Sequence, residues 1–412
     1  METDIRLSAT YNIERSEHLL HTKKALPILF SVMFLVMVGF GIIIPVLPFY
    51  AEELGASPAQ LGLLMAVYSF MQLMFAPMWG RISDRIGRKP VMMLGILGLA
   101  FSFFFMGAAT ELWMLFAARI IGGFLSSANM PTVMAYAADI TSEEDRGKGM
   151  GIIGAAVGLG FVFGPAIGGI FSETSLALPF YIAGASSLLT FFLVLFILKE
   201  SLGNEEERIR AEKTPFRKAW NSPISILYFL QLFVSLSLSG LEATFAYFAA
   251  EKAGLGTIEL GYIFMIMGFC GALVQGGLVG KLTKQFGEGF VIQIGIVTSA
   301  LGFALILLVN NFATAAVFLS IFGIGNGVIR PSVSALITKT ATTGYGNAAG
   351  FLSSFDSLGR IIGPPLGGWF FSISIGLPYI SGIVLSFAAF LLYYVYKTQS
   401  KKLPVSASSA EG

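Results

Sequence analysis

Apolar residues dominate this chain in twelve long stretches that polar segments separate. A helix needs about 20 mostly apolar residues to cross the hydrocarbon core of a bilayer, and each stretch has that length. The pattern therefore predicts an all-α membrane protein with twelve transmembrane helices. The stretches lie near residues 26–49, 59–79, 90–109, 112–137, 148–171, 177–198, 223–249, 258–280, 289–309, 312–338, 346–371 and 376–396.

The second half of the chain repeats the first. Five residues of the fifth stretch recur 199 positions later in the eleventh: Gly160, Gly164, Pro165, Gly168 and Gly169 correspond to Gly359, Gly363, Pro364, Gly367 and Gly368. A row of glycines lets two helices in lipid approach closely, and the proline removes a backbone donor beside that face. A parallel repeat of two membrane halves is one known architecture of secondary transporters. We therefore expect two six-helix bundles.

One long polar segment, residues 199–222, lies between the two repeats. We interpret it as the linker between the bundles. The predicted organisation is an N-terminal tail (1–25), a first bundle (26–198), the linker (199–222), a second bundle (223–397) and a C-terminal tail (398–412).

Composition and charge agree with this interpretation. The chain is 55 % hydrophobic and 12 % charged, so lipid must solvate its apolar surface. Of 26 Lys and Arg, 22 lie in the tails or in the segments after even-numbered spans, three lie within spans, and only Lys252 lies on the other side. The positive-inside rule then predicts that both termini and the linker face the cytoplasm. The basic residues are a topological signal and do not indicate nucleic acid.

The segment after the second span reads GRISDRIGRK over residues 80–89. Its four cations could be only the topological signal, but that leaves Asp84 unexplained. Gly80 and Gly87 flank this acid and would allow a tight reversal of the chain. The second copy of the segment, residues 280–288, keeps both glycines but has Lys284 in place of the acid.

The first copy resembles the G-x-x-x-D-R-x-G-R-[RK] motif of the major facilitator superfamily. Arg119 to Gly123 in span 4 and the glycine pattern of span 5 are also similar to that superfamily, the latter to its antiporters. Together they resemble the drug:proton antiporter group with twelve spans, in particular the multidrug efflux pumps of Gram-positive bacteria. The resemblance implies a cavity lined mainly by spans 1, 4, 7 and 10. It also implies a cytoplasmic gate in which Asp84 latches against the start of span 11, with these residues: Gly80, Asp84, Arg85, Gly87 and Arg88.

Charges inside a span need a reason, because each costs about 2.5–3.5 kcal/mol at the helix centre. Glu242 in span 7 lies roughly 13 Å along a helix from Glu251. It could be a carboxylate near the outer water interface. We favour a protonatable carrier, since a low-dielectric cavity favours the neutral acid. Alternating access to the two sides of the membrane would then let the acid load and release a proton. The string LSGLEATF over residues 238–245 resembles the family segment whose Glu binds substrate and proton.

Span 10 departs from the family, which has an Asp four residues before the Arg330–Pro331 pair; here the residue is Asn326, which cannot carry a proton. An acid appears instead at Asp356, four residues before Arg360 and therefore on the same helix face. Asp356 is either a neutralising partner of Arg360 or a coupling acid in place of the missing one.

Other polar residues in spans leave two interpretations open. Arg119 is a donor to backbone carbonyls of span 1 or, as the family match implies, part of the proton relay. The same two interpretations, structural donor or part of the relay, apply to Arg330. Tyr68 and Gln72 match family positions that line the drug cavity, although such residues often serve only helix packing. The residues expected at the substrate cavity are Tyr68, Gln72, Asn129, Glu242, Phe245 and Asn326.

Several motifs are missing from the sequence. It has no Walker A loop, no nucleophile elbow, one cysteine (Cys270), and only His18 and His21 as histidines. We therefore expect no cofactor, no metal site and no enzymatic activity. The favoured function is proton-driven export of small, hydrophobic, cationic compounds by a monomer in the plasma membrane. The alternatives are efflux of a defined metabolite (a sugar, an amino acid or a lipid-linked compound) and a non-transporting membrane sensor.

Overall fold

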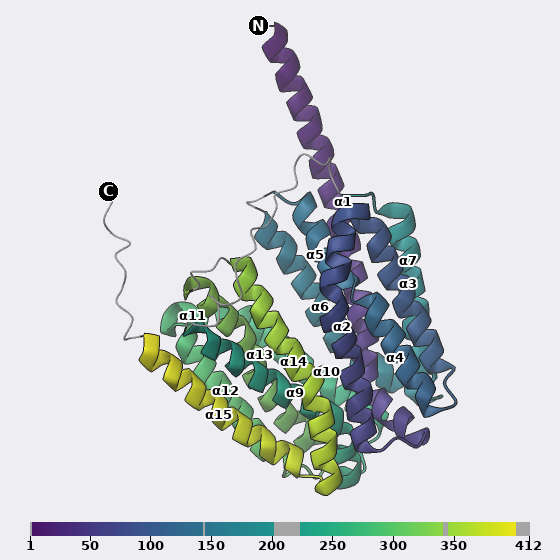
Figure 1. Cartoon of the computed structure of the whole chain (residues 1–412), viewed down its shortest axis with the longest axis vertical. Helices are drawn as coiled ribbons and strands as arrows, with labels where there is room; N and C mark the ends of the chain where they lie inside the picture. Colours follow the sequence, from purple (N-terminus) through teal and green to yellow (C-terminus); the bar gives the residue numbers. More distant parts are fainter. Residues whose placement is uncertain (1, 143–144, 202–222, 341–344, 401–412) are drawn as a thin grey trace. The chain divides into compact units, whose positions relative to one another are not determined.

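The computed structural model describes the backbone of residues 2–142, 145–201, 223–340 and 345–400, and side chains from residue 25 onward except 345–347. Most of the predicted linker and of the C-terminal tail lies outside these residues. The described part is helical and contains no strand (Figure 1). Its helices are α1 (Glu2–Glu53), α2 (Pro58–Ile86), α3 (Arg88–Gly107), α4 (Leu112–Ser126), α5 (Asn129–Ile140), α6 (Arg146–Ser172), α7 (Leu178–Ile197), α9 (Ile224–Ala253), α10 (Thr257–Gly277), α11 (Val279–Phe286), α12 (Glu288–Ile306), α13 (Phe312–Thr340), α14 (Tyr345–Ile373) and α15 (Leu377–Ser400).

The predicted spans correspond to these helices one by one. Eleven segments of the described chain are long and apolar enough to cross a membrane. The fourth consists of α4 and α5, which a short break at Ser127 and Ala128 separates. The remaining predicted span, the eleventh, is α14, a 29-residue helix that carries Asp356, Arg360 and two prolines.

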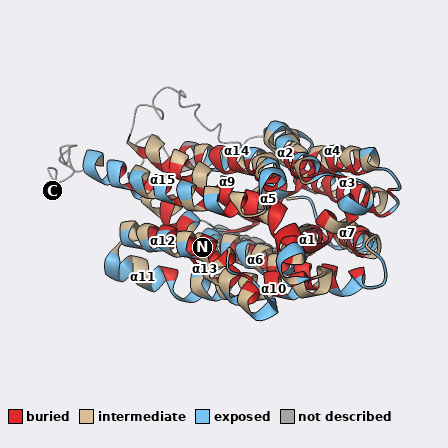
Figure 2. Ribbon diagram, turned by 90° about the horizontal axis from the view of Figure 1, so that it is seen from below, coloured by how far each residue is buried: buried red, intermediate tan, exposed pale blue. Residues whose placement is uncertain are grey.

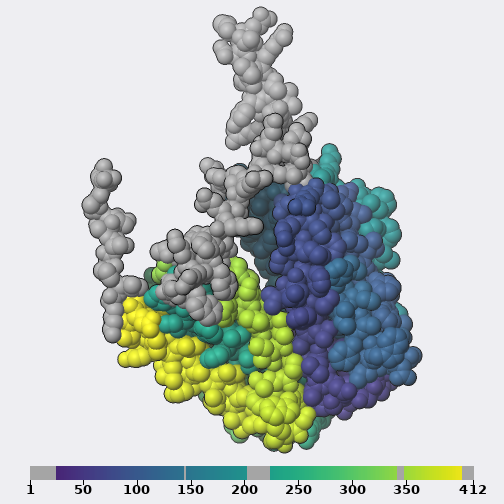
Figure 3. All heavy atoms as spheres, viewed as in Figure 1, coloured from purple at the N-terminus to yellow at the C-terminus, as the bar shows by residue number. Residues whose placement is uncertain are grey.

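The helices form two compact units. Unit 1 comprises residues 1–56, 67–209 and 257–265, and unit 2 comprises residues 57–66, 210–256 and 266–412. The chain passes from one unit to the other inside two continuous helices, α2 and α10. Figure 3 shows α15, in yellow, forming one face of unit 2.

The repeated glycines build one close helix pair in each unit. In unit 1, a β-carbon on Gly164 of α6 would lie 2.7 Å from the Cα of Gly41 in α1. In unit 2, a β-carbon on Gly367 of α14 would lie 3.0 Å from the Cα of Gly240 in α9. Neither position has room for a larger residue. The glycine rows therefore act as predicted, letting two backbones meet in lipid.

The segment that sequence reasoning interpreted as a loop after span 2 is mostly helix. The helix α2 continues through Gly80 to Ile86, and only Gly87, with φ of 111°, takes a left-handed conformation there. In the second copy, α11 is helical and Gly287, with φ of 81°, makes the reversal. The prediction that both flanking glycines reverse the chain was wrong for Gly80, because one residue at positive φ is enough to join two helices.

Burial follows the pattern expected for helices packed in lipid. Buried residues, red in Figure 2, lie where helices of a unit pack on one another. Large apolar side chains remain exposed on many helices, among them Phe101, Trp113, Phe196, Trp369 and Phe387. Lipid can cover such surfaces, whereas water cannot do so at low cost.

Candidate functional site

Among the described residues, the charged side chains that form ion pairs inside the helices of unit 2 gather around Asp356. Its side chain is buried, and its two oxygens accept from different partners. Oδ1 accepts hydrogen bonds from Gln231 Nε2, at 2.9 Å, and from Ser235 Oγ. Oδ2 lies 3.4 Å from Arg360 Nε and 3.6 Å from Arg330 Nη1. Asp356 thus joins three helices, α9, α13 and α14, through its carboxylate.

The glycine row explains why these side chains meet. Gly359 and Gly363 of α14 contact the backbone of α9 near Leu236. Gln231 and Ser235 are four residues apart on α9, so they lie on one face, and Gln231 also donates to Ser235, at 3.1 Å. The close backbones bring this polar face onto α14 beside Asp356.

The predicted Asp356–Arg360 pair is confirmed as a contact. Sequence reasoning missed the other partners of the carboxylate, because Gln231, Ser235 and Arg330 belong to other helices. Three hydrogen bonds and a second arginine at 3.6 Å compensate a buried negative charge far better than Arg360 alone would.

Glu242 differs from Asp356 in its surroundings, although both lie in unit 2. It is half-buried on α9, in the electrostatic field of Arg360 and Asp356. Among the described residues, none donates a hydrogen bond to its side chain or forms an ion pair with it. A change in the charge of Glu242 therefore breaks no hydrogen bond or ion pair among the described residues.

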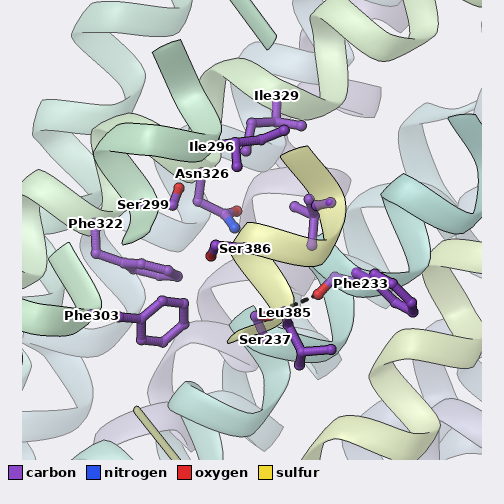
Figure 4. Close-up of a pocket in the computed structure, with 12 residues that line it drawn as sticks. Phe233, Ser237, Ile296, Ser299, Phe303, Phe322, Asn326, Ile329, Leu385 and Ser386 are labelled. Carbon is purple, nitrogen blue, oxygen red and sulfur yellow. Dashed lines mark hydrogen bonds between the residues drawn. The ribbon is translucent and has the colours of Figure 1, made fainter. Parts of the chain in front are cut away.

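Asn326 lines a small cavity inside unit 2 (Figure 4). Figure 4 shows its amide directed toward Ser386. The lining residues come from α9, α12, α13 and α15: Phe233, Val234, Ser237, Ile296, Ser299, Phe303, Phe322, Asn326, Ile329, Leu385, Ser386 and Ala389. The cavity volume is about 10 Å³, enough for one water molecule. This space is far smaller than a drug-sized ligand requires, and the placement of Asn326 at a substrate cavity stays a prediction.

Three residues predicted in unit 1 form one cluster. The Arg119 guanidinium lies 4.3 Å from the centre of the Tyr68 ring, a cation–π contact. The Tyr68 hydroxyl hydrogen-bonds with Ser126 and accepts from Gln72 Nε2 at 3.3 Å. Arg119 and Tyr68 are both buried, so Arg119 already covers a face of this ring.

Two more of the expected cavity residues are buried inside their units. Asn129 is 2 % exposed, and both polar atoms of its amide lack a hydrogen-bond partner among the described residues. Phe245 is fully buried on α9.

The charged residues at the junction of α2 and α3 form a clamp around Arg88. Its guanidinium pairs with Asp84, donates to Ser83 Oγ at 2.8 Å, and lies 3.1 Å from Asp139 Oδ2. Arg85, another residue expected at the gate, is exposed. Arg88 thereby ties α2, α3 and α5 together at one helix junction.

Glu200 completes this junction, and sequence reasoning did not identify it. Its carboxylate accepts from the backbone N–H of Arg88 at 2.8 Å and of Lys89 at 3.0 Å, which caps the first turn of α3. A β-carbon on Gly87 would lie 2.5 Å from this carboxylate, so the close approach requires glycine. The available signal was an acid directly after an apolar span, which by itself does not indicate its partner.

The span 5 motif packs against two elements of unit 1. A β-carbon on Gly160 would lie 2.9 Å from the carbonyl oxygen of Phe34 in α1. At the other end, a β-carbon on Gly169 would lie 2.7 Å from the carbonyl oxygen of Thr257, the first residue of α10. The other members, Gly164, Pro165 and Gly168, are buried between these contacts.

Sequence and structure comparisons bear on the family. A family model described as Major Facilitator Superfamily matches residues 29–345 and, in an overlapping second match, residues 227–412. Multidrug resistance protein 2 of Bacillus subtilis (strain 168) is 33 % identical over 366 residues, 87 % of this chain and 92 % of that protein. Quinolone resistance protein NorA of Staphylococcus aureus (strain MSSA476) is 29 % identical over 381 residues, 92 % of this chain and 98 % of that protein.

A solved structure supports the fold. A bacterial homolog of the human lysosomal transporter Spinster, in an inward-facing and occupied conformation, matches with a TM-score of 0.76 at 17 % identity. The match covers 92 % of this chain and 97 % of that one. The resemblance inferred from the span 2 and span 5 motifs, and the twelve-helix membrane fold, are thus confirmed. This chain belongs to the Major Facilitator Superfamily.

Proposed function

We propose that this protein exports small, hydrophobic, cationic compounds from the cytoplasm in exchange for protons. Relatives named for multidrug and quinolone resistance, similar over most of the chain, support the substrate class. In this proposal the protein is a monomer in the plasma membrane, with both termini cytoplasmic as the distribution of Lys and Arg predicts. It needs no cofactor and carries out no covalent chemistry.

The contrast between Asp356 and Glu242, both inside helices of unit 2, carries the proposal. Asp356 accepts three hydrogen bonds and forms an ion pair with Arg330, whereas Glu242 has no hydrogen-bond or ion-pair partner among the described residues. A carboxylate that leaves water and gains no such partner is costly in free energy. The neutral form of Glu242 is therefore accessible. We assign proton exchange to Glu242 and a structural role to Asp356 with its arginines.

The transport cycle follows from alternating access. Glu242 takes a proton while it is open to the outside, and gives it up on the cytoplasmic side when a cationic substrate arrives. The cation then compensates the carboxylate charge that the departing proton leaves behind. Proton and cation compete for one group, which is the minimal device for antiport.

The clamp of unit 1 has a separate role in this proposal. Asp84, Arg88, Asp139 and Glu200 fix the junction of α2 and α3, so α2 and α3 move as one body when the cytoplasmic side opens and closes. Arg119, held on Tyr68, supplies a fixed positive charge in the same unit. The predicted contact of Asp84 with the start of span 11 is part of the gating hypothesis.

Transport into vesicles tests the proposal. Purified protein is reconstituted in liposomes, a pH gradient is imposed, and uptake of the fluorescent cation ethidium is followed. Glu242→Gln should lower the pH-driven rate at least ten-fold, because Gln keeps the shape but cannot titrate. Glu251→Gln, which removes an exposed acid from the same helix, is the matched control and should transport normally. A normal rate for Glu242→Gln would show that the proton carrier lies elsewhere.

A further inference from the structure

The second copy of the basic segment has no role in the proposed cycle. It forms α11, a helix of eight residues with two distinct faces. On one face Val279 is buried and Leu282 packs beside it, in an apolar cluster with Val274, Val291 and Val328. On the other face Lys281 and Lys284 are exposed. The apolar face thus fixes the helix so that both lysines point outward.

No carboxylate neutralises these two lysines within the part of the chain that the structure describes. In the first copy, Asp84 and Asp139 both pair with Arg88. In the second copy, Lys284 stands at the position of Asp84. The acid nearest along the chain, Glu288, already pairs with Lys339. The segment therefore carries an uncompensated positive charge next to the ends of two membrane spans, α10 and α12.

Exposed apolar side chains flank the lysines. Leu278 is 49 % exposed, Phe286 is 51 % exposed and Phe290 is 43 % exposed. The rings of Phe286 and Phe290 pack with centroids 5.1 Å apart. Water solvates such rings poorly, and the hydrocarbon core solvates lysines poorly. Both kinds of side chain are satisfied at the boundary between lipid head groups and acyl chains.

We propose that α11 is a docking surface for anionic phospholipids. The ammonium groups of Lys281 and Lys284 contact lipid phosphates, while Leu278, Phe286 and Phe290 reach the upper acyl chains. The positive charge selects anionic over zwitterionic head groups, because the latter carry their own cation beside the phosphate. The occupant is a bilayer lipid and not a soluble phosphate, since exposed apolar side chains surround the lysines.

Lipid selectivity of the reconstituted full-length protein tests this proposal. The protein is placed in nanodiscs of phosphatidylcholine with 30 % phosphatidylglycerol, and the lipids that remain bound after transfer to detergent are counted by native mass spectrometry. The double variant Lys281→Gln/Lys284→Gln should lose at least half of the excess of phosphatidylglycerol over phosphatidylcholine. Lys281→Arg/Lys284→Arg keeps the charge and should retain the excess, as should Lys252→Gln at another helix end.

Two results would overturn the proposal. One is an unchanged excess of phosphatidylglycerol in the Gln double variant, with thermal unfolding in detergent showing that the variant is folded. The other is displacement of the bound lipid by millimolar glycerol 3-phosphate, which would indicate a site for small phosphates. The lipid count requires no transport, so it can fail or succeed independently of the proposed antiport.

Discussion

The two units of this protein place their carboxylates at different levels of their helices. In unit 1, Asp84, Asp139 and Glu200 gather at the junction of α2 and α3. In unit 2, Asp356 lies within α14 and Glu242 within α9, while the corresponding junction carries Lys284 and one acid, Glu288, which pairs with Lys339. The first copy therefore gathers three acids at this helix junction, whereas the second has Glu288 there and carries Asp356 and Glu242 inside helices.

This difference separates two tasks that antiport requires. Carboxylates at a helix junction contact basic side chains and backbone donors, so they fix the geometry of that junction. Carboxylates inside a span cost free energy unless a positive charge compensates them or a proton neutralises them. The arrival of a proton or a cation therefore changes their energy. Both units contain the same close helix pair built on glycines, and they differ in where their charged residues lie.

The largest effect on stability should come from breaking the network of unit 2. Asp356→Asn leaves Arg330 and Arg360 without their carboxylate, and losing one partner of a buried ion pair typically costs about 3–5 kcal/mol. Thermal unfolding in detergent should show a large drop in the stability of this variant. The double variant Asp356→Asn/Arg360→Gln should regain most of it, because the Arg330 side chain is 54 % exposed and can reach solvent. Equal losses in the single and double variants would contradict the structural role.

A smaller effect is expected at the clamp of unit 1. Gly87→Ala forces a side chain into a left-handed conformation, which costs about 1–3 kcal/mol, and pushes it against Glu200. Glu200→Gln should cost about 0.5–2 kcal/mol, as removal of a helix cap does. Both losses are measured by thermal unfolding, and transport should fall while equilibrium drug binding persists. A parallel loss of drug binding would argue against a role in gating.

The smallest effect should follow from transplanting the acid. Lys284→Asp gives the second copy the residue of the first, and a surface charge change of this kind is worth about 0–1 kcal/mol. The variant should transport within about two-fold of the wild type, because the second copy has no counterpart of Asp139 or Glu200 with which to build a clamp. A ten-fold change in vesicle transport would show that this junction also gates.

Sequence reasoning reached the features that depend on local spacing. The twelve spans follow from apolar length, the helix pairs from the glycine rows, and the Asp356–Arg360 contact from a four-residue interval. The contacts of Asp356 with Gln231 and Arg330 join helices far apart along the chain. They depend on how each helix is rotated, which the sequence of one helix does not specify.

Two other features show the same limit. The side of α13 that carries Asn326 faces a small internal cavity, and only the packing of four helices reveals this. Gly80 was expected to mark a reversal, because glycine interrupts many helices of soluble proteins. In α2 the helix continues through it, as a helix in lipid readily does.

Proton release caused by substrate tests the central claim most directly, because it separates Glu242 from Asp356 without transport. Purified protein in weakly buffered detergent solution is mixed with ethidium, and a pH dye reports the protons released. The wild type and the double variant Asp356→Asn/Arg360→Gln should both release protons, whereas Glu242→Gln should release none. Release of as many protons by Glu242→Gln as by the wild type would contradict the assignment of proton exchange to Glu242.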